Sequence, residues 1–122
     1  MIAHAREVRP NECCGLLIGT PVRIERIHRA RNLERGSARF LIDPRDHFAA
    51  IREARDSGRF VVGVYHSHPR GGATPSPSDL AEASYDDYLY LIVGLVSEPF
   101  EVKLFRLEDG VFVEEPVIKV KS

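Results

Sequence analysis

Residues 60–65 form an apolar, β-branched run, Phe-Val-Val-Gly-Val-Tyr, which predicts a buried strand. The run leads directly into His66-Ser67-His68. Side chains two residues apart lie on the same face of a strand, with their backbones roughly 7 Å apart. Two neutral imidazoles at that spacing can bind one Zn²⁺ ion together. The run therefore predicts a sheet core with a pair of metal ligands at the carboxyl end of one strand.

A third candidate ligand, Asp79, follows the histidines. It belongs to Ser76-Pro77-Ser78-Asp79, which predicts a helix start with Ser76 as the N-cap and Pro77 in the first turn. A carboxylate in that turn can face the strand end, and three protein ligands leave a fourth tetrahedral position to water, as in catalytic zinc sites. Each residue also has an ordinary explanation, because a histidine at a strand end is more often hydrogen-bonded than metal-bound.

The stretch from His66 to Asp79 fits the pattern H-x-H-P-x(6)-S-x-x-D, and Glu12 precedes an apolar run over residues 13–19. This combination resembles the JAMM zinc metalloprotease family, also called MPN+, in its short prokaryotic form. The resemblance covers residues 3–113, nearly the whole chain. Its strongest parts are the histidine pattern and the block that begins at Glu12.

The resemblance implies a role for each of five side chains. His66, His68 and Asp79 would bind one Zn²⁺ ion per chain. Glu12 would be the general acid/base of a hydrolysis, and Ser76 would stabilise the tetrahedral intermediate. The implied fold is α/β, a mixed β-sheet covered by helices, as in the MPN/JAMM domain, which is cytidine deaminase-like.

The implied activity is that of a zinc-dependent metallopeptidase or isopeptidase. Such enzymes cut at the C-terminal Gly-Gly tail of ubiquitin-like or sulfur-carrier proteins, so a carrier protein is the expected substrate. The alternative is a catalytically silent scaffold or binding module of the same fold, but such scaffolds typically lack a metal ligand and none is missing here. A zinc deaminase is disfavoured because the chain has no C-x-x-C. A gluzincin is disfavoured because there is no H-E-x-x-H.

The residues themselves leave three points open. A glutamate before a strand is ordinarily solvated, so Glu12 stands out only through the family pattern. The Ser76 hydroxyl can serve as the helix cap or as an oxyanion donor. Arginines outnumber acids between residues 23 and 39, which fits either the solvated face of a strand or a surface that attracts an acidic protein substrate.

Composition and charge set the broad class of protein. With 122 residues, of which 43% are hydrophobic, residues 1–122 are expected to form a single domain with its own core. The net charge of −1 argues against a nucleic-acid-binding surface. No apolar run approaches the roughly 20 residues that span a bilayer, and Met1 is not followed by a signal-peptide hydrophobic region. We therefore expect no membrane contact and a cytoplasmic protein.

Cysteine usage and chain length complete these expectations. Cys13 and Cys14 are adjacent, which is poor geometry for a mutual disulfide, so a reducing compartment and two small buried side chains are expected. Family members usually carry a strand and most of a helix before the position of His4. Either the start lies further upstream or an edge strand is missing. The oligomeric state stays open, with a homodimer among the options.

The remaining sequence predicts short helices and strands in alternation. Helices are expected over residues 3–9, from Asp43 to Ser57-Gly58, and over 77–85. Further strands are expected over residues 13–20, 22–30, 38–42, 88–97, 100–107 and 111–115, with a hairpin turn at Glu108-Asp109-Gly110. Residues 38–42 are expected to be an edge onto which the substrate tail adds as a strand, with Arg35 and Arg39 orienting an acidic carrier.

Overall fold

The computed structural model describes residues 1–34, 40–77, 79 and 87–116. In chain order its elements are α1 (Ile2–Val8), β1 (Cys14–Thr20), β2 (Arg23–Ala30), α2 (Pro44–Asp56), β3 (Phe60–His68), β4 (Leu89–Gly94), β5 (Glu101–Glu108) and β6 (Val111–Glu115). Apart from β3, which continues through the histidine pair, each lies within its predicted range or extends one residue beyond it. None of the helices in these described ranges is long and apolar enough to cross a membrane.

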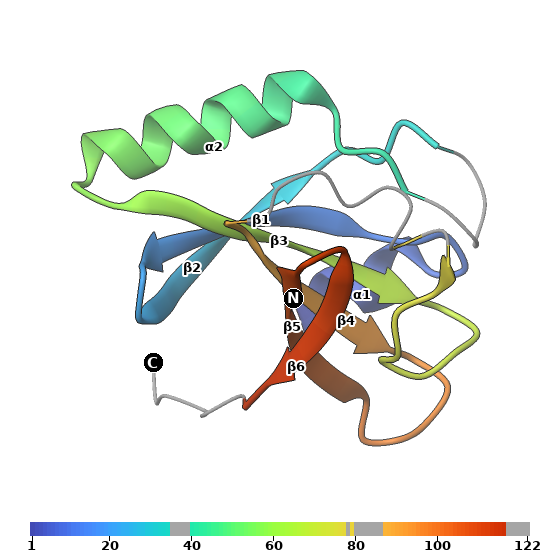
Figure 1. Cartoon of the computed structure of the whole chain (residues 1–122). Helices are drawn as coiled ribbons and strands as arrows, with labels where there is room; N and C mark the ends of the chain where they lie inside the picture. The colour runs from blue at the N-terminus through green and yellow to red at the C-terminus, as the bar shows by residue number, and fades with distance from the viewer. Residues whose placement is uncertain (35–39, 78, 80–86, 117–122) are drawn as a thin grey trace.

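The strands form one mixed sheet in the order β2-β1-β3-β4-β5-β6 (Figure 1). Strands β3 and β4 are parallel, and the other neighbours are antiparallel. Helix α2 packs on one face of the sheet against β1, β2 and β3, and α1 packs on the opposite face. The predicted architecture, a mixed sheet with helices on its faces, is confirmed.

The core lies on both faces of the sheet, and β1 is buried on each. Leu16 and Ile18 point to the α2 side, whereas Leu17 points to the α1 side. The two cysteines divide in the same way, with Cys14 on the α2 side and Cys13 on the α1 side, both buried as expected. Burying one aliphatic side chain contributes about 1.5–3 kcal/mol to stability. Strand β1 therefore gives a rigid base to Glu12 and Cys13, which precede it.

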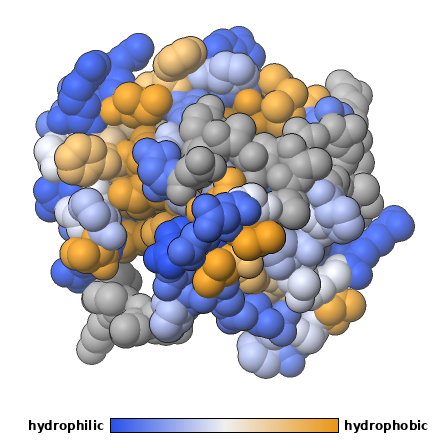
Figure 2. Space-filling model, viewed as in Figure 1, coloured by the Kyte–Doolittle hydropathy of each residue, from blue (hydrophilic) through white to orange (hydrophobic). Residues whose placement is uncertain are grey.

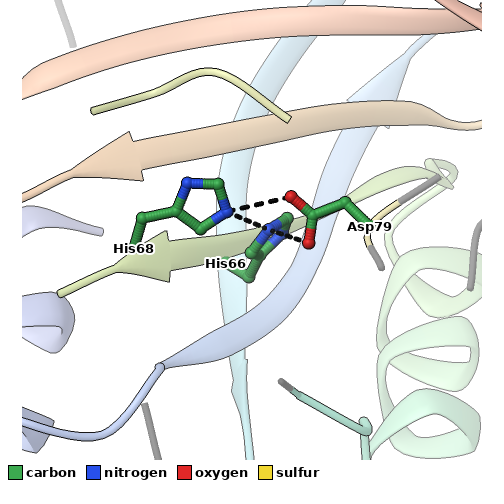
Figure 3. Close-up of side chains that lie close together, drawn as sticks. All are labelled: His66, His68 and Asp79. Carbon is green, nitrogen blue, oxygen red and sulfur yellow. Dashed lines mark hydrogen bonds and ion pairs between the residues drawn. The ribbon is translucent and has the colours of Figure 1, made fainter. Parts of the chain in front are cut away.

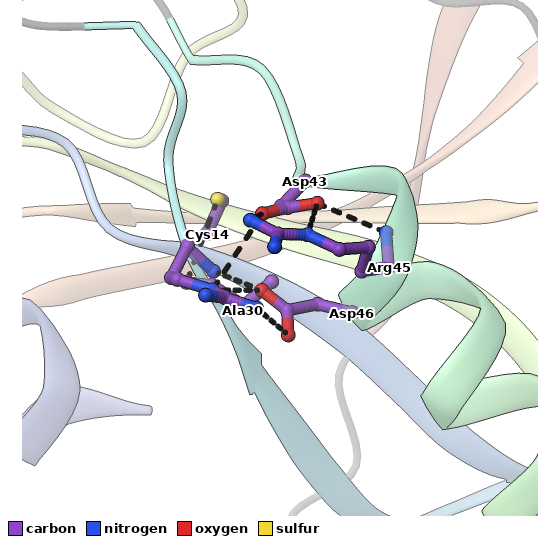
Figure 4. A network of polar contacts seen from close by, with 6 residues as sticks. Cys14, Ala30, Asp43, Arg45 and Asp46 are labelled. Carbon is purple, nitrogen blue, oxygen red and sulfur yellow. Dashed lines mark hydrogen bonds and ion pairs between the residues drawn. The ribbon is translucent and has the colours of Figure 1, made fainter.

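Helix α2 begins at a polar network that joins it to the end of β2 (Figure 4). Asp43 caps the helix and accepts the Arg45 backbone N–H at 2.9 Å, as the sequence predicts. The Arg45 side chain also binds Asp43 and holds the pKa of that carboxyl at about 2. Asp46 accepts the backbone N–H of Arg31 at 2.7 Å. The network fixes the segment that enters α2, which lies beside the metal centre described below.

The predicted hairpin between β5 and β6 is confirmed. Asp109 and Gly110 have φ values of 52° and 78°. Two consecutive residues with positive φ characterise the tight turn that matches the twist of antiparallel strands.

Two predicted elements differ from the structure or lie partly outside it. Residues 40–42 do not continue a regular strand: Ile42 makes one isolated bridge with Asn32. The reason is that the Asn32 side chain accepts the Leu41 backbone N–H, which a partner strand would need. The rest of that predicted edge, with Arg35 and Arg39, lies outside the described residues. Of the predicted helix 77–85, Pro77 and Asp79 have helical backbone, and residues 78 and 80–85 lie outside the described residues.

Candidate metal centre

His66 and His68 occupy the carboxyl end of β3, where the strand is held on both sides. Residue 66 pairs with Cys14 of β1 and with Ile92 of β4. The two rings point the same way from the strand, as the spacing predicts, and their Nε2 atoms lie 3.2 Å apart (Figure 3). Because neighbouring strands fix the backbone of the pair, the two donor atoms are preorganised.

Asp79 faces the two imidazoles from the helical turn that follows the loop (Figure 3). Its Oδ1 lies 3.0 Å from His66 Nε2, and its Oδ2 lies 2.9 Å from His68 Nε2. The carboxylate also accepts the Ser76 backbone N–H at 2.8 Å, while Ser76 Oγ accepts the Asp79 backbone N–H at 3.1 Å. This reciprocal cap, which the sequence predicts, aims the carboxylate at the histidines.

The three donor atoms fit a tetrahedral metal ion. All lie within 4.8 Å of one another. Ligand atoms bound to zinc at about 2.0–2.1 Å stand about 3.3 Å apart in tetrahedral geometry. The two Nε2 atoms lie 3.2 Å apart, and each has a different Asp79 oxygen within 3.0 Å. His68 Nδ1 lies 2.9 Å from the Gly72 carbonyl oxygen, so it carries the proton and leaves Nε2 to a metal. Two imidazoles and one carboxylate also form a donor set that suits Zn²⁺.

The charges of the three groups suit a cation. For Asp79, burial alone raises the pKa, but the hydrogen bonds from His66 and His68 outweigh it and hold the pKa well below its usual range. Burial lowers the pKa of His66. For His68, burial also lowers the pKa, but the bonds to Asp79 and to the Gly72 carbonyl outweigh it and raise the pKa. A metal must displace the proton of His68, so its affinity should fall in acid.

Glu12 lies beside His68 and is buried. Since Cys14 pairs with His66 in antiparallel register, the chain two residues earlier runs opposite His68, on the same face. Only 4% of Glu12 is exposed, and its Oε1 has no hydrogen-bond partner among the described residues. Burial raises the pKa of Glu12 to about 7, against the opposing effect of His68. The ordinary expectation of a solvated glutamate is wrong at this position.

The loop between His68 and Ser76 is tied to the sheet through one peptide group. The Gly72 carbonyl oxygen meets His68 Nδ1, and the N–H of the same peptide, from Ala73, donates to Glu101 Oε1 at 2.7 Å. Gly94 lies directly under this peptide, because a Cβ there would meet Gly72 and Ala73 at 2.4–2.6 Å. Glu101 is thus connected to the His68 imidazole through a main-chain peptide, a contact the sequence does not reveal.

Phe40 forms a wall of the centre that the sequence does not reveal. Its ring stacks on His66 with centroids 4.3 Å apart. Phe40 also borders a cavity of about 460 Å³ between α2 and the sheet. The lining is mostly apolar and comprises Phe40, Leu41, Ile42, Pro44, His47, Phe48, Ile51, Val64, Tyr88 and Tyr90. Apolar surface is visible on the same side of the molecule (Figure 2). The centre therefore borders room for an apolar group.

Comparisons with known proteins show what the chain is similar to. A family model described as prokaryotic homologs of the JAB domain matches residues 1–108. The CysO-cysteine peptidase of Mycobacterium tuberculosis is 35% identical over 126 aligned positions, which cover 100% of this chain and 86% of the relative. The desampylase of Haloferax volcanii is 32% identical over 99 positions, covering 75% of this chain and 71% of the relative.

A solved structure shares the fold of this chain. Protein DSY2949 from Desulfitobacterium hafniense superposes with a TM-score of 0.87 and is 35% identical in sequence. The match covers 97% of this chain and 84% of that protein. The sheet and both flanking helices described above are thus common to this chain and a close structural neighbour.

Proposed function

The chain belongs to the prokaryotic homologues of the JAB domain, and from that membership we propose that it is a zinc-dependent metallopeptidase that hydrolyses a peptide or isopeptide bond. The observation that carries the proposal is the convergence of His66, His68 and Asp79, whose donor atoms lie within 4.8 Å of one another. A buried carboxylate, Glu12, stands beside them. We assign the three converging residues as the zinc ligands.

The proposed substrate is the C-terminal Gly-Gly tail of a ubiquitin-like or sulfur-carrier protein. Relatives named for the cleavage of CysO-cysteine and of TtuB-protein conjugates support this substrate class. The Phe40 ring packs on His66 and bounds the centre on that side. A tail of glycines carries no side chains and can lie extended beside such a wall.

Two side chains are assigned to the chemistry of hydrolysis. A bound zinc ion supplies Lewis-acid activation of the attacking water and of the scissile carbonyl. Glu12 accepts a proton from the attacking water and passes it to the leaving amine, a role that suits a carboxyl whose pKa is raised to about 7. Ser76 donates a hydrogen bond to the developing oxyanion. Its capping bond uses the hydroxyl as an acceptor, so the two roles draw on different capacities of one group.

Metal analysis of ligand variants tests the zinc assignment. We expect one zinc ion per chain in the purified protein, and strong loss of zinc in His66→Ala, His68→Ala and Asp79→Ala, because each removes one of three protein ligands. His28→Ala is the matched control, since His28 pairs with Glu53 away from the centre. Full zinc occupancy in both His66→Ala and His68→Ala would show that the zinc site does not include these two residues of β3.

Turnover of a carrier protein fused through its tail to a reporter tests the catalytic assignment. Zinc-loaded Glu12→Gln should keep its metal and lose about 10²-fold or more in rate, the range expected for a general acid/base. Near wild-type turnover by that variant would show that Glu12 is not the general acid/base. Zinc binding without any turnover by the wild-type protein would favour the silent scaffold instead.

A further inference from the structure

The peptide group between Glu12 and Cys13 is held by a side chain at each end. Its carbonyl oxygen, from Glu12, accepts a hydrogen bond from Asn32 Nδ2 at 3.0 Å. Its N–H, from Cys13, donates to Ser67 Oγ at 2.9 Å. This peptide precedes the first residue of β1. Two side chains therefore make the hydrogen bonds that neighbouring strands make to the peptides within β1. Its orientation depends on them.

The direction of the Glu12 side chain follows from that peptide. Glu12 Oε1 has no hydrogen-bond partner among the described residues, although the residue is buried. A carboxylate without such a bond is placed mainly by its main chain and by packing. A small rotation of the peptide would therefore move the carboxylate relative to the metal ligands, and misplacement by about 1 Å can cost about 10²-fold in rate.

Asn32 also binds the segment that walls the centre. Its Oδ1 accepts the backbone N–H of Leu41 at 2.8 Å and that of Glu34 at 3.0 Å. Phe40, the neighbour of Leu41, stacks on His66. One half-buried amide thus connects the main chain of Glu12 to the residues that pack on a metal-facing imidazole. Only a side chain with a donor and an acceptor at its end can make both connections.

We propose that Asn32 is a positioning residue that holds Glu12 in place for proton transfer and ties it to the segment that carries Phe40. The inference rests on the proposed function, because it gives Asn32 its role through Glu12. Asn32 itself acts on the main chain of Glu12 and need not touch the substrate.

The substitution Asn32→Asp separates the two connections. Aspartate keeps an oxygen for the N–H groups of Leu41 and Glu34 but has no donor for the Glu12 carbonyl. We expect kcat to fall about 10- to 100-fold, with KM and zinc content unchanged. Asn11→Asp is the matched control, because it places the same charge next to Glu12 at an exposed position and should leave kcat unchanged.

A double-substitution cycle separates positioning from general damage. In the Glu12→Gln background, Asn32→Asp should cause no further loss of kcat, because the group that Asn32 positions is already inactive. A further loss equal to that in the wild-type background, or wild-type kcat in Asn32→Asp alone, would overturn the proposal. Should Asn32→Asp not fold, Asn32→Gln carries the same two groups on a longer stem and should lower kcat at unchanged zinc content.

Amide hydrogen exchange tests the contact without any activity. In Asn32→Asp the Cys13 amide should exchange faster than in the wild-type protein, while the Leu41 amide keeps its protection. Unchanged protection of Cys13 would overturn the proposal even in a protein that cleaves. Absence of cleavage by the zinc-loaded wild-type protein would instead refute the proposed function, and the exchange result would still decide whether Asn32 holds the peptide.

Discussion

A buried carboxylate with an oxygen that has no hydrogen bond is costly, and Glu12 is such a group in the described part of the chain. Unpaired buried charge destabilises a fold, and such groups gather where chemistry needs them. Burial disfavours the charged form of Glu12 and so raises its pKa to about 7. The same feature that makes Glu12 suitable for proton transfer near neutral pH should therefore make the metal-free fold less stable.

Substituting Glu12 by glutamine should stabilise the metal-free protein in a pH-dependent way. The folded state binds the Glu12 proton more tightly than the unfolded state, so wild-type stability falls as pH rises from the ordinary value of 4.5 through about 7. At pH 8, Glu12→Gln should raise the free energy of unfolding by up to about 3 kcal/mol, at 1.36 kcal/mol per pKa unit. Below the ordinary pKa the two proteins should be equally stable.

Urea unfolding of chelator-treated protein at several pH values measures this difference. Glu114→Gln, at an exposed strand position, is the control and should show no such pH-dependent gain. A Glu12→Gln variant that matches the wild-type protein at every pH would show that Glu12 is solvated when the metal is absent.

At the scale of elements, the loop after β3 depends on a contact from β5. Glu101, the first residue of β5, accepts the Ala73 N–H, and the carbonyl of that same peptide meets His68. A negative charge at the N–H end polarises the peptide and makes its carbonyl a better acceptor for the imidazole proton. The imidazole then becomes a stronger donor to a metal, as for carboxylate-supported histidines in metal sites.

Removing that carboxylate should weaken zinc binding while leaving the three ligands intact. We expect Glu101→Ala to lower zinc affinity about 10-fold, the lower end of the range for residues that support a ligand. Glu101→Gln keeps a hydrogen-bond acceptor without the charge, so its zinc affinity should lie between those of Glu101→Ala and the wild-type protein. Competition with a chromogenic chelator measures the affinity, and Glu98→Gln in the neighbouring loop is the control. Wild-type affinity in Glu101→Ala would mean that the loop holds His68 without help from β5.

Most elements of the fold can be predicted from local signals in the sequence, but the segment before α2 cannot. Continuous apolar runs predict the central strands. The Asp43 cap and the Asp109-Gly110 turn predict where elements begin and turn, because these signals are local. The histidine pair follows from strand alternation alone. The strand predicted over 38–42 is wrong in its described part, because a distant side chain, Asn32, takes the Leu41 N–H. Such long-range partners leave no local signal.

The burial of Glu12 has no local signal in the sequence either. Statistics for glutamate predict a solvated side chain, and only the resemblance to a known family predicts a position near the histidines. The structure buries it because antiparallel pairing of β1 with β3 carries the chain past His68. Phe40 and Glu101 come from other parts of the chain: Phe40 stacks on His66, and Glu101 binds the loop peptide that contacts His68.

At the scale of the whole molecule, three arginines of the arginine-rich stretch form ion pairs within the described part of the chain. Arg26 pairs with Glu53 at 2.7 Å and Arg29 with Glu7 at 2.6 Å, and Arg31 binds Asp46 at 3.2 Å. These arginines lie on β2 or directly after it, and their partners come from both helices. The pairs favour the solvated face of a strand over a surface that attracts an acidic carrier. The net charge of −1 likewise gives no overall positive excess to attract an acidic partner.

Cleavage should therefore depend only weakly on salt. Electrostatically steered association falls steeply as ionic strength rises, because salt screens charges beyond about 10 Å at 0.1 M. Because Arg26 and Arg29 on β2 are already paired, raising NaCl from about 50 to about 300 mM should change kcat/KM of the carrier fusion by less than about threefold. Arg29→Gln, which removes a cation already paired with Glu7, should leave kcat/KM unchanged at both salt concentrations. A steep fall with salt that Arg29→Gln abolishes would show that this strand face attracts the substrate. A steep fall that persists in Arg29→Gln would point to Arg35 and Arg39 instead, as the sequence predicts.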